Sequence, residues 1–412
     1  MNSNKDILKG SKTSQSTRNC PALRFPGFSD PWTQTTLGEV AERVTRRNSN
    51  NITLRPLTIS AQYGLIDQRD FFDKVVASSN LEGYYLLKKG EFAYNRSSSS
   101  NYPWGAIKRL EHYNDGALST LYICFSLGYG HPIFFSYFFE TTNWYNHIQS
   151  VSAEGARNHG LLNIAVSDFF ALPLSLPSLG EQRKIAEFLS LIDDRLEVSA
   201  KIIKELKTQK AGLQDAIFKQ RLRFPGFSDP WTQTSLGEVV RLPEQIEVSS
   251  PKLEDILSVK LHGKGIARTN ATTLQLGATK YYIRKQGQLI YGKQNFHNGA
   301  IALISENYDN GITSKDIPSF DLNRQLVAPL FLLSFLLRTE YYTAMEVYTT
   351  GTGSKRLKED VFFNLPVSFP SLGEQEKIAA FLSLIDERIE VEERLLRKYE
   401  EQKRYLLQQM FV

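Results

Sequence analysis

Residues 177–198 read PSLGEQRKIAEFLSLIDDRLEV, and residues 370–391 read PSLGEQEKIAAFLSLIDERIEV. The two segments are identical at 18 of 22 positions and lie 193 residues apart. A second pair precedes them, LRFPGFSDPWTQTTLGEV at 23–40 and LRFPGFSDPWTQTSLGEV at 222–239, with 17 of 18 positions identical at an offset of 199. A chain that repeats at a nearly fixed offset is built from repeated structural units, so we predict a tandem duplication of about 195 residues.

The segments at 177–198 and 370–391 each predict the start of a long helix. Pro177 precedes Ser178 and Glu181, a Ser-x-x-Glu capping box that Ser371 and Glu374 repeat. Apolar residues then recur at alternating spacings of four and three, a period of 3.5 residues that is typical of coiled coils. The seam positions are Ile185, Leu189, Ile192, Leu196, Ser199, Ile203, Leu206, Lys210, Leu213 and Ile217, and Ile378, Leu382, Ile385, Ile389, Glu392, Leu396, Tyr399, Lys403, Leu406 and Met410.

The two helices differ along their length. Their first halves are nearly identical, whereas positions 199–218 and 392–411 match at only four of 20 places. The identical halves indicate either a second role, such as binding the same partner twice, or recent duplication. The polar seam residues Ser199, Lys210, Glu392 and Lys403 either set the register or are tolerated defects.

The stretches between the repeated blocks, 41–176 and 240–369, have diverged but keep a common outline. YYLLKKGEFAY at 84–94 answers YYIRKQGQLIY at 281–291 at five of 11 positions. Short aromatic and β-branched runs broken by Gly, Asn and Asp predict α+β domains with a mixed sheet plus helices. We expect the two long helices to form an antiparallel coiled coil with pseudo-twofold symmetry between the copies.

These patterns predict five segments. They are a flexible N-terminal arm at 1–22, domains at 23–176 and 222–369, and long helices at 177–221 and 370–412. The apolar run LVAPLFLLSFLL at 326–337 is too short to span a bilayer and predicts a buried core helix.

Composition restricts the class of protein. The net charge of +5 and pI near 8.9 permit a polyanionic partner without requiring one. Cys20 and Cys124 form neither a disulfide framework nor a zinc set, which is typical of a reducing cytosol. The N-terminal residues carry no apolar segment of the signal-peptide type, so we expect a cytoplasmic protein with no membrane partner.

Each variable domain ends with a similar element, LPLSLPSLGEQRKIA at 172–186 and LPVSFPSLGEQEKIA at 365–379. Two domains that end in this way resemble the specificity (S) subunit of type I restriction-modification systems. GEFAYNR at 90–96 and GQLIYGK at 287–293 are similar to the Gly-acidic-apolar pattern of that family's target-recognition domains, with Gln288 in place of the acidic residue. The resemblance implies a subunit that binds double-stranded DNA, two methyltransferase (M) subunits and, through them, restriction/translocase (R) subunits. It also implies a bipartite DNA site with one half read by each domain.

The physical pattern agrees with that role. A helix of ~40 residues is ~60 Å long, which limits the gap between half-sites to at most ~18 base pairs. Two unlike domains predict an asymmetric site, because half-site symmetry follows protein symmetry.

Candidate DNA contacts follow from residue type and glycine-rich setting, since phosphates attract Lys and Arg while base edges bond to Arg, Asn, Gln and Ser. The candidates of the first domain are Lys88, Lys89, Arg96, Arg157 and Asn158. Those of the second domain are Lys285, Lys293, Asn295, Lys355 and Arg356. The alternative for each is a solvated surface charge.

The sequence offers no pattern for catalysis. It has no G-x-G-x-x-G after a strand, no Asn-Pro-Pro-aromatic methyltransferase motif and no P-loop, and its six histidines form no pair at metal-ligand spacing. The acids and lysine of LEDILSVK at 253–260 predict a helix turn rather than a nuclease site. We therefore expect a non-catalytic subunit with no metal and no cofactor.

Two alternatives remain at this stage. One is the specificity component of a differently organised, type II-like modification system. The other is a coiled-coil interaction scaffold whose variable domains bind proteins.

Overall fold

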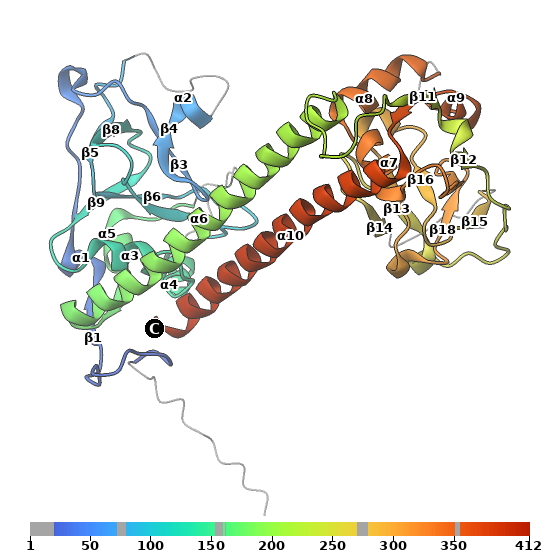
Figure 1. Cartoon of the computed structure of the whole chain (residues 1–412). Helices are drawn as coiled ribbons and strands as arrows, with labels where there is room; N and C mark the ends of the chain where they lie inside the picture. Colours follow the sequence, from blue (N-terminus) through green and yellow to red (C-terminus); the bar gives the residue numbers. More distant parts are fainter. Residues whose placement is uncertain (1–19, 72–79, 153–159, 161, 270–278, 351–354) are drawn as a thin grey trace, which may run out of the picture. The chain divides into compact units, whose positions relative to one another are not determined.

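The computed structural model describes residues 20–71, 80–152, 160, 162–269, 279–350 and 355–412. The described residues within Met1–Ser199 and Leu395–Val412 form one compact unit, and those within Ala200–Arg394 form the other (Figure 1). Each unit thus combines one α+β domain, the first half of the helix that follows it, and the second half of the other long helix. The candidates Arg157 and Asn158, and residues 1–19 of the predicted arm, lie outside the described residues.

The first domain is built from short strands and helices. The strands are β1 (Thr33–Thr36), β2 (Ala41–Arg43), β3 (Leu57–Ser60), β4 (Gly64–Asp67), β5 (Tyr85–Lys88), β6 (Phe92–Asn95), β7 (Ala106–Arg109), β8 (Asp115–Leu118), β9 (Ile123–Leu127) and β10 (Pro173–Leu176). The helices are α1 (Leu37–Val40), η1 (Ser49–Asn51), α2 (Gln68–Phe71), α3 (Pro132–Phe138), α4 (Tyr145–Val151) and α5 (Val166–Phe170). A four-stranded antiparallel sheet has the order β2-β9-β6-β7, beside the pairs β1-β10, β3-β4 and β5-β8. A parallel bridge from Pro56 to Ala117 links the last two pairs.

The second domain repeats this arrangement. Its strands are β11 (Thr232–Ser235), β12 (Val240–Arg241), β13 (Leu257–Val259), β14 (Ile266–Arg268), β15 (Tyr281–Ile283), β16 (Leu289–Tyr291), β17 (Ile301–Leu303), β18 (Ile312–Ser314), β19 (Ser319–Leu322) and β20 (Pro366–Phe369). Its helices are η2 (Leu236–Glu238), η3 (Leu253–Asp255), η4 (Phe296–Asn298), η5 (Glu306–Tyr308), α7 (Pro329–Leu336), α8 (Thr339–Ala344), η6 (Met345–Tyr348) and α9 (Glu359–Phe363). The sheet order β12-β19-β16-β17 and the pairs β11-β20, β13-β14 and β15-β18 match the first domain strand for strand. The prediction that both variable stretches share one fold is confirmed.

Strand register identifies equivalent residues in the two domains. Phe92 faces Arg109 across β6 and β7, and Leu289 faces Leu303 across β16 and β17. Arg109 is therefore equivalent to Leu303, and Lys108 to Ala302.

The predicted helix turn at 253–260 is the short 3₁₀ helix η3, which leads into strand β13.

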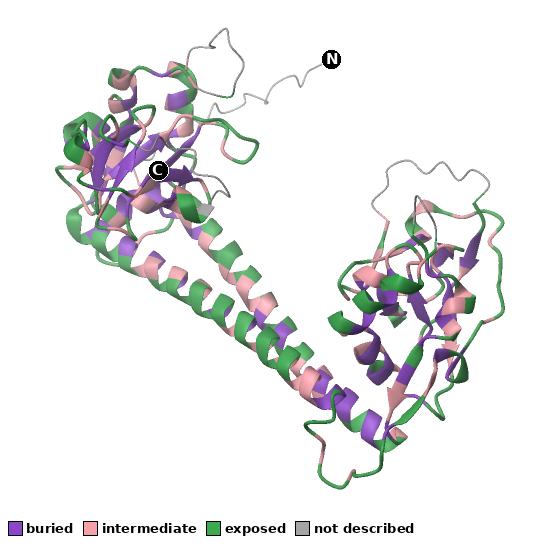
Figure 2. Cartoon of the chain, turned by 90° about the horizontal axis from the view of Figure 1, so that it is seen from above, coloured by how far each residue is buried: buried purple, intermediate pink, exposed green. Residues whose placement is uncertain are grey.

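Aromatic rings fill each domain core, and the end of a long helix completes it. Figure 2 shows the buried residues gathered within each domain. Tyr94 stacks on Phe169 with ring centroids 4.9 Å apart in the first domain, and Tyr291 stacks on Phe362 at 4.5 Å in the second. Ring pairs of this kind add about 0.5–1.5 kcal/mol beyond the area they bury.

The residues that follow the long helices take part in these cores. Phe411, just after the second helix, packs on Phe134 at 5.1 Å, and Phe218, at the end of the first, packs on Phe331 at 5.5 Å. Trp32 and Trp231 of the repeated block are buried beside the same two phenylalanines, which agrees with a packing role.

The two long helices are α6 (Leu179–Phe218) and α10 (Leu372–Gln409), and they run antiparallel. In the first unit, Lys403 forms an ion pair with Asp193 at 2.8 Å, and the guanidinium of Arg195 donates to the hydroxyl of Tyr399. In the second unit, Lys207 pairs with Glu393 and Lys210 with Asp386. Residue numbers rise on one helix as they fall on the other, so the predicted antiparallel coiled coil is confirmed.

The polar seam positions Lys210 and Lys403 make equivalent contacts. Lys210 pairs with Asp386, and Lys403 pairs with Asp193, which is the repeat equivalent of Asp386. A charged pair at a seam position favours one register of a coiled coil, because any slip would separate the charges. These contacts favour a register-setting role over a tolerated defect.

The capping boxes form only in part, because an arginine takes the glutamate side chain. Ser178 accepts a hydrogen bond from the Glu181 backbone N–H at 3.3 Å, as expected at a helix start. The buried Glu181 carboxylate instead accepts two hydrogen bonds from Arg24, and Glu374 accepts two from Arg223. These bidentate pairs explain why the LRFPGF and SLGEQ segments are repeated together.

The glutamine of each SLGEQ segment also has a structural role. Gln182 accepts a hydrogen bond from the His131 N–H, immediately before α3, and Gln375 accepts one from the Ala328 N–H, immediately before α7. Both side chains are almost fully buried.

The apolar run at 326–337 contains α7, whose residues Phe331, Leu332, Phe335 and Leu336 are buried. The prediction of a core helix is therefore confirmed. Among the described residues, no helix combines the length and apolar character needed to cross a membrane.

Candidate nucleic-acid interface

The β5–β6 turn and its equivalent, the β15–β16 turn, hold the first group of sequence candidates. Gly90 and Gly287 adopt φ values of 92° and 81°, which glycine accepts readily. The Glu91 carboxylate accepts a hydrogen bond from the Lys88 backbone N–H at 2.7 Å. The side-chain amide oxygen of Gln288 accepts the equivalent bond from the Lys285 backbone N–H at 3.0 Å. Glutamine can thus replace the acidic residue because the turn requires an oxygen acceptor rather than a charge.

The lysines of these turns differ in their partners. Lys88 and Lys89 are exposed and have no ion pair among the residues that the structure describes. Lys285 is also exposed, and its ammonium donates to the Asn310 side-chain oxygen at 2.6 Å.

Arg96 lies at the opposite end of β6 from Lys88 and Lys89. Its guanidinium donates to the backbone carbonyls of Leu121, at 2.9 Å, and Ile164, at 3.5 Å. These bonds hold three chain segments together, and they engage the guanidinium in the protein itself.

The remaining candidates of the second domain lie close together. Lys293 pairs with Glu359 at 2.8 Å, Lys355 with Glu346 at 2.5 Å, and Arg356 with Asp316 at 2.9 Å. The Lys293 carbonyl accepts the Leu357 N–H, so the two segments are adjacent. Asn295 accepts a hydrogen bond from Asn298 at the start of η4. Each cation in this group is balanced by a carboxylate, and Lys285 lies at the other end of β16.

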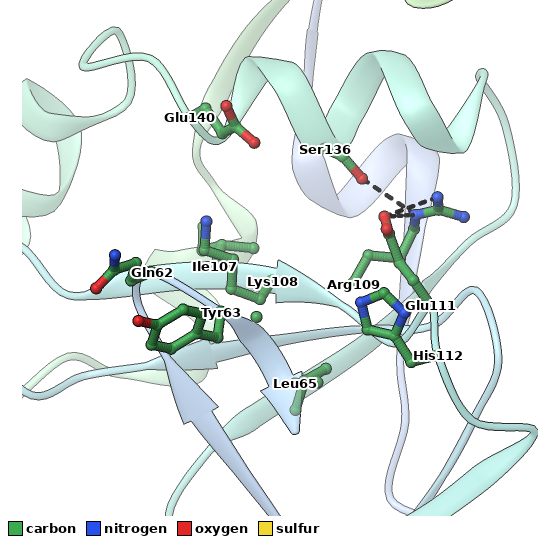
Figure 3. A pocket seen from close by; sticks show the side chains of 11 residues that line it. Gln62, Tyr63, Leu65, Ile107, Lys108, Arg109, Glu111, His112, Ser136 and Glu140 are labelled. Atoms are coloured by element: carbon green, nitrogen blue, oxygen red, sulfur yellow. Dashed lines mark hydrogen bonds and ion pairs between the residues drawn. The ribbon is translucent and has the colours of Figure 1, made fainter. Parts of the chain in front are cut away.

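A polar pocket in the first domain was missed by sequence reasoning. It has a volume of about 180 Å³ and lies between the β3–β4 turn, strand β7 and helix α3 (Figure 3). Gln62 and Tyr63 of the turn are exposed, and Lys108 and Arg109 of β7 line the opposite wall. The guanidinium of Arg109 donates to Ser136 at 3.1 Å and to Glu111 at 2.8 Å, which fixes its orientation (Figure 3).

The equivalent turn in the second domain, between β13 and β14, is basic. Lys260, His262 and Lys264 are exposed on it. The His262 N–H donates to the Asn298 carbonyl at 2.8 Å, and the Gly263 N–H donates to the Gly299 carbonyl at 2.9 Å. Gly299 permits this approach, because a Cβ there would lie 3.2 Å from the His262 Cα.

A signal for the basic wall of the first-domain pocket was present in the repeat. GAIKRL at 105–110 aligns with GAIALI at 299–304, so Lys108 and Arg109 replace Ala302 and Leu303 on otherwise matching strands. Where an apolar residue of one domain is replaced by a basic residue on the equivalent strand of the other, the surfaces of the two domains differ.

A sequence model of the family described as "Type I restriction modification DNA specificity domain" matches residues 118–208 and 229–401, which together exceed half of the chain. The chain belongs to this family. Each matched region begins in a domain and runs into the long helix that follows it. The resemblance drawn from the repeated helix starts is thereby confirmed.

Two relatives of this family can be compared directly. The chain is 22% identical over 272 residues to the Type I restriction enzyme MjaVIII specificity subunit of Methanocaldococcus jannaschii, covering 60% of this chain and 63% of that protein. It therefore spans less than two thirds of the relative's length. The chain is also similar to the crystal structure of the Type-I restriction-modification system S subunit from M. genitalium, with a TM-score of 0.58, 16% identity, and coverage of 95% of this chain and 99% of that one. At this identity the likeness concerns the fold alone.

Burial shifts the pKa of several side chains inside the domain cores. Burial raises the pKa of the Cys124 thiol to about 12 and lowers the pKa of the Arg284 guanidinium to about 10. Among the described residues, no group of three His, Cys, Asp or Glu side chains is arranged to hold a metal ion. The exposed turns described above offer cationic and amide donors, the groups that bind phosphates and base edges.

Proposed function

We propose that this chain is the DNA-specificity subunit of a type I restriction-modification complex. The domain at 23–176 reads one half of a bipartite, gapped site on double-stranded DNA, and the domain at 222–369 reads the other half. The helices at 177–221 and 370–412 set the gap and bind two methyltransferase subunits, through which restriction/translocase subunits join. The subunit acts in the cytoplasm, carries no catalytic group and needs no cofactor of its own.

One observation carries this proposal. The two domains have the same strand order but present different surfaces, and the chain belongs to a DNA-specificity family. A duplicated reader with unlike surfaces suits a site whose two halves differ in sequence. The helices, of 40 and 38 residues, give a spacer of about 60 Å at most, which corresponds to no more than ~18 base pairs.

Exposed apolar residues that recur in both copies support a partner that binds twice. Leu191 and Leu384 are equivalent, and their exposed fractions are 66% and 64%. Val198 and Val391, one heptad further along, are 46% and 38% exposed. Their repetition is not explained by packing within the chain, whereas a shared docking site for two identical methyltransferase subunits accounts for it.

Methylation mapping tests the reading of a bipartite site. The chain is expressed with the methyltransferase subunit of its system, and modified bases are mapped in host DNA. We expect an asymmetric, gapped motif, and exchange of residues 41–176 for those of another family member should change only one half of it. A short continuous motif, or a change in both halves, would contradict the proposal.

Stoichiometry tests the docking site. Leu191→Lys or Leu384→Lys should reduce the number of bound methyltransferase subunits from two to one, and the double variant should bind none, as measured by mass photometry. Val347→Lys is the matched control, because Val347 is 80% exposed but lies outside the repeated segments. Retention of two methyltransferase subunits by the double variant would rule out this surface.

A further inference from the structure

The turns of two equivalent hairpins occupy the same place in the two domains. The first turn, residues 61–64, joins β3 to the first residue of β4, and the second, residues 260–265, lies between β13 and β14. The first turn lines a pocket with Lys108 and Arg109 of β7. The second is bonded through His262 and Gly263 to residues 298 and 299, directly before β17, which is the equivalent of β7. Each turn therefore lies beside the same edge strand of its four-stranded sheet.

The side chains on these turns differ completely. Gln62 and Tyr63, an amide and a ring that is 60% exposed, stand on the first. Lys260, His262 and Lys264 stand on the second. The basic residues near the first turn are instead on the strand beside it, at Lys108 and Arg109. Polar and cationic groups thus gather at one place in both domains, although different elements supply them.

The availability of Lys260 and Lys264 separates the second turn from the other candidate cations of its domain, since Lys285 donates to Asn310. Lys293, Lys355, Arg356 and Arg96 are engaged by carboxylates or carbonyls. Lys260 and Lys264 have no ion pair among the residues with a described placement. The backbone of the second turn is held by hydrogen bonds from the N–H groups of Lys260, His262 and Gly263 to the carbonyls of residues 265, 298 and 299, so its side chains stand on a tethered loop.

We propose that the turns at 61–64 and 260–265 enter the DNA major groove and determine which bases each half-site contains. This inference rests on the proposed function and deepens it. A two-stranded β-ribbon fits the major groove, where Gln bonds to adenine N6 and N7 and Lys bonds to guanine O6 and N7. Gln62 accordingly reads an adenine in the half-site of the first domain, while Lys260 and Lys264 read guanines in that of the second. Lys108 lies where it contacts a phosphate beside the first turn.

Two variants test the assignment in the full complex with the methyltransferase subunit. Gln62→Ala alters the first turn, and Lys260→Ala with Lys264→Ala alters the second. The matched controls are Lys88→Ala with Lys89→Ala in the first domain and Arg241→Ala with Lys252→Ala in the second, which remove exposed charges elsewhere. The wild-type methylated motif is mapped first, and competition binding then uses duplexes that carry this motif or single base-pair changes in it.

Each turn variant should lose about tenfold or more of its discrimination at one or more base pairs of its own half-site. The other half-site should be read as before, and retained discrimination at the remaining base pairs of the mutated half-site shows that the mutated domain is folded. The controls should leave discrimination unchanged at every base pair, even where they weaken binding, because a charge that contacts only phosphate carries no base information.

Discrimination that stays within twofold of wild type for both turn variants would overturn the inference. A wild-type complex that methylates no gapped motif would instead overturn the proposed function, so the two failures are distinguishable.

Discussion

The two domains share every described strand pairing, yet they fill one core position in opposite ways. In the first domain, Leu87 lies fully buried in an apolar cluster with Leu118 and Cys124. In the second, Arg284 takes the equivalent place and is only 1% exposed. Its guanidinium donates to Thr313 at 2.6 Å, Ser319 at 3.1 Å, Gln245 at 3.2 Å and the Ile317 carbonyl at 3.2 Å.

The neighbours changed together with the central residue. Strand register makes Thr313 equivalent to Leu118 and Ser319 equivalent to Cys124. One strand arrangement therefore accepts either an apolar filling or a fully hydrogen-bonded polar one. It does not accept a mixture, because a buried donor without a partner costs about 1–3 kcal/mol and a buried charge costs more.

The largest expected loss of stability comes from placing the polar core residue of the second domain in the apolar core of the first. Leu87→Arg alone places a guanidinium among apolar side chains, and we expect a loss of more than about 4 kcal/mol, enough to unfold the first domain. Hydrogen–deuterium exchange, followed separately in each unit, measures this. The triple variant Leu87→Arg, Leu118→Thr and Cys124→Ser is the control and should recover part of the protection. Unchanged exchange in the single variant would contradict the comparison.

Removing the aromatic residue that each long helix supplies should have a similar effect in the two units. Phe411→Ala should destabilise the first unit and Phe218→Ala the second, each by about 3–5 kcal/mol, because both rings are buried and leave a cavity. Chemical denaturation monitored by exchange in each unit distinguishes them. If either substitution loosened both units equally, the division into two units would need revision.

The seam lysines should give the smallest effect and an unequal one. Lys403 is 17% exposed and pairs with both Glu140 and Asp193, so Lys403→Met should cost about 2 kcal/mol. Among the described residues Lys210 pairs with the exposed Asp386 alone, and Lys210→Met should cost no more than about 1 kcal/mol. Equal losses would show that Glu140 contributes nothing.

The pH dependence of the Lys403 contribution has a definite sign. Burial lowers the pKa of Lys403, but Glu140 and Asp193 outweigh burial and raise it above 10.5. A raised pKa means that this stabilisation is fully present below about pH 10.5 and is lost as the pH rises through the folded-state value. The difference in denaturation midpoint between wild type and Lys403→Met should therefore shrink as the pH rises through the alkaline range.

The fold was largely predictable from the sequence because the repeats and heptads are local patterns. The seam from Ile185 to Ile217 and its copy predicted the antiparallel helices, and the matching YY…G…Y outline predicted equivalent domains. The Glu181 side chain departed from the capping box because its partner, Arg24, lies 157 residues away, and no local pattern reports such a contact.

The candidate site was less predictable, for the same physical reason. Lys293, Lys355 and Arg356 look free in the sequence, but Glu359, Glu346 and Asp316 reach them only after folding. Arg96 is similar, since its carbonyl acceptors come from remote segments. The turns at 61–64 and 260–265 carry no motif, and their common position becomes visible only through strand register.

The contribution of residues 395–412 to the first unit has a consequence for the order of biosynthesis. Leu406, Met410 and Phe411 belong to the core cluster of the first domain, and the Leu23 N–H donates to the Gln409 carbonyl. The second unit, by contrast, is one uninterrupted segment, Ala200–Arg394. Because a ribosome delivers the chain from its N-terminus, the second unit can be complete before the first. The domain that is translated first is therefore the last to receive its full core.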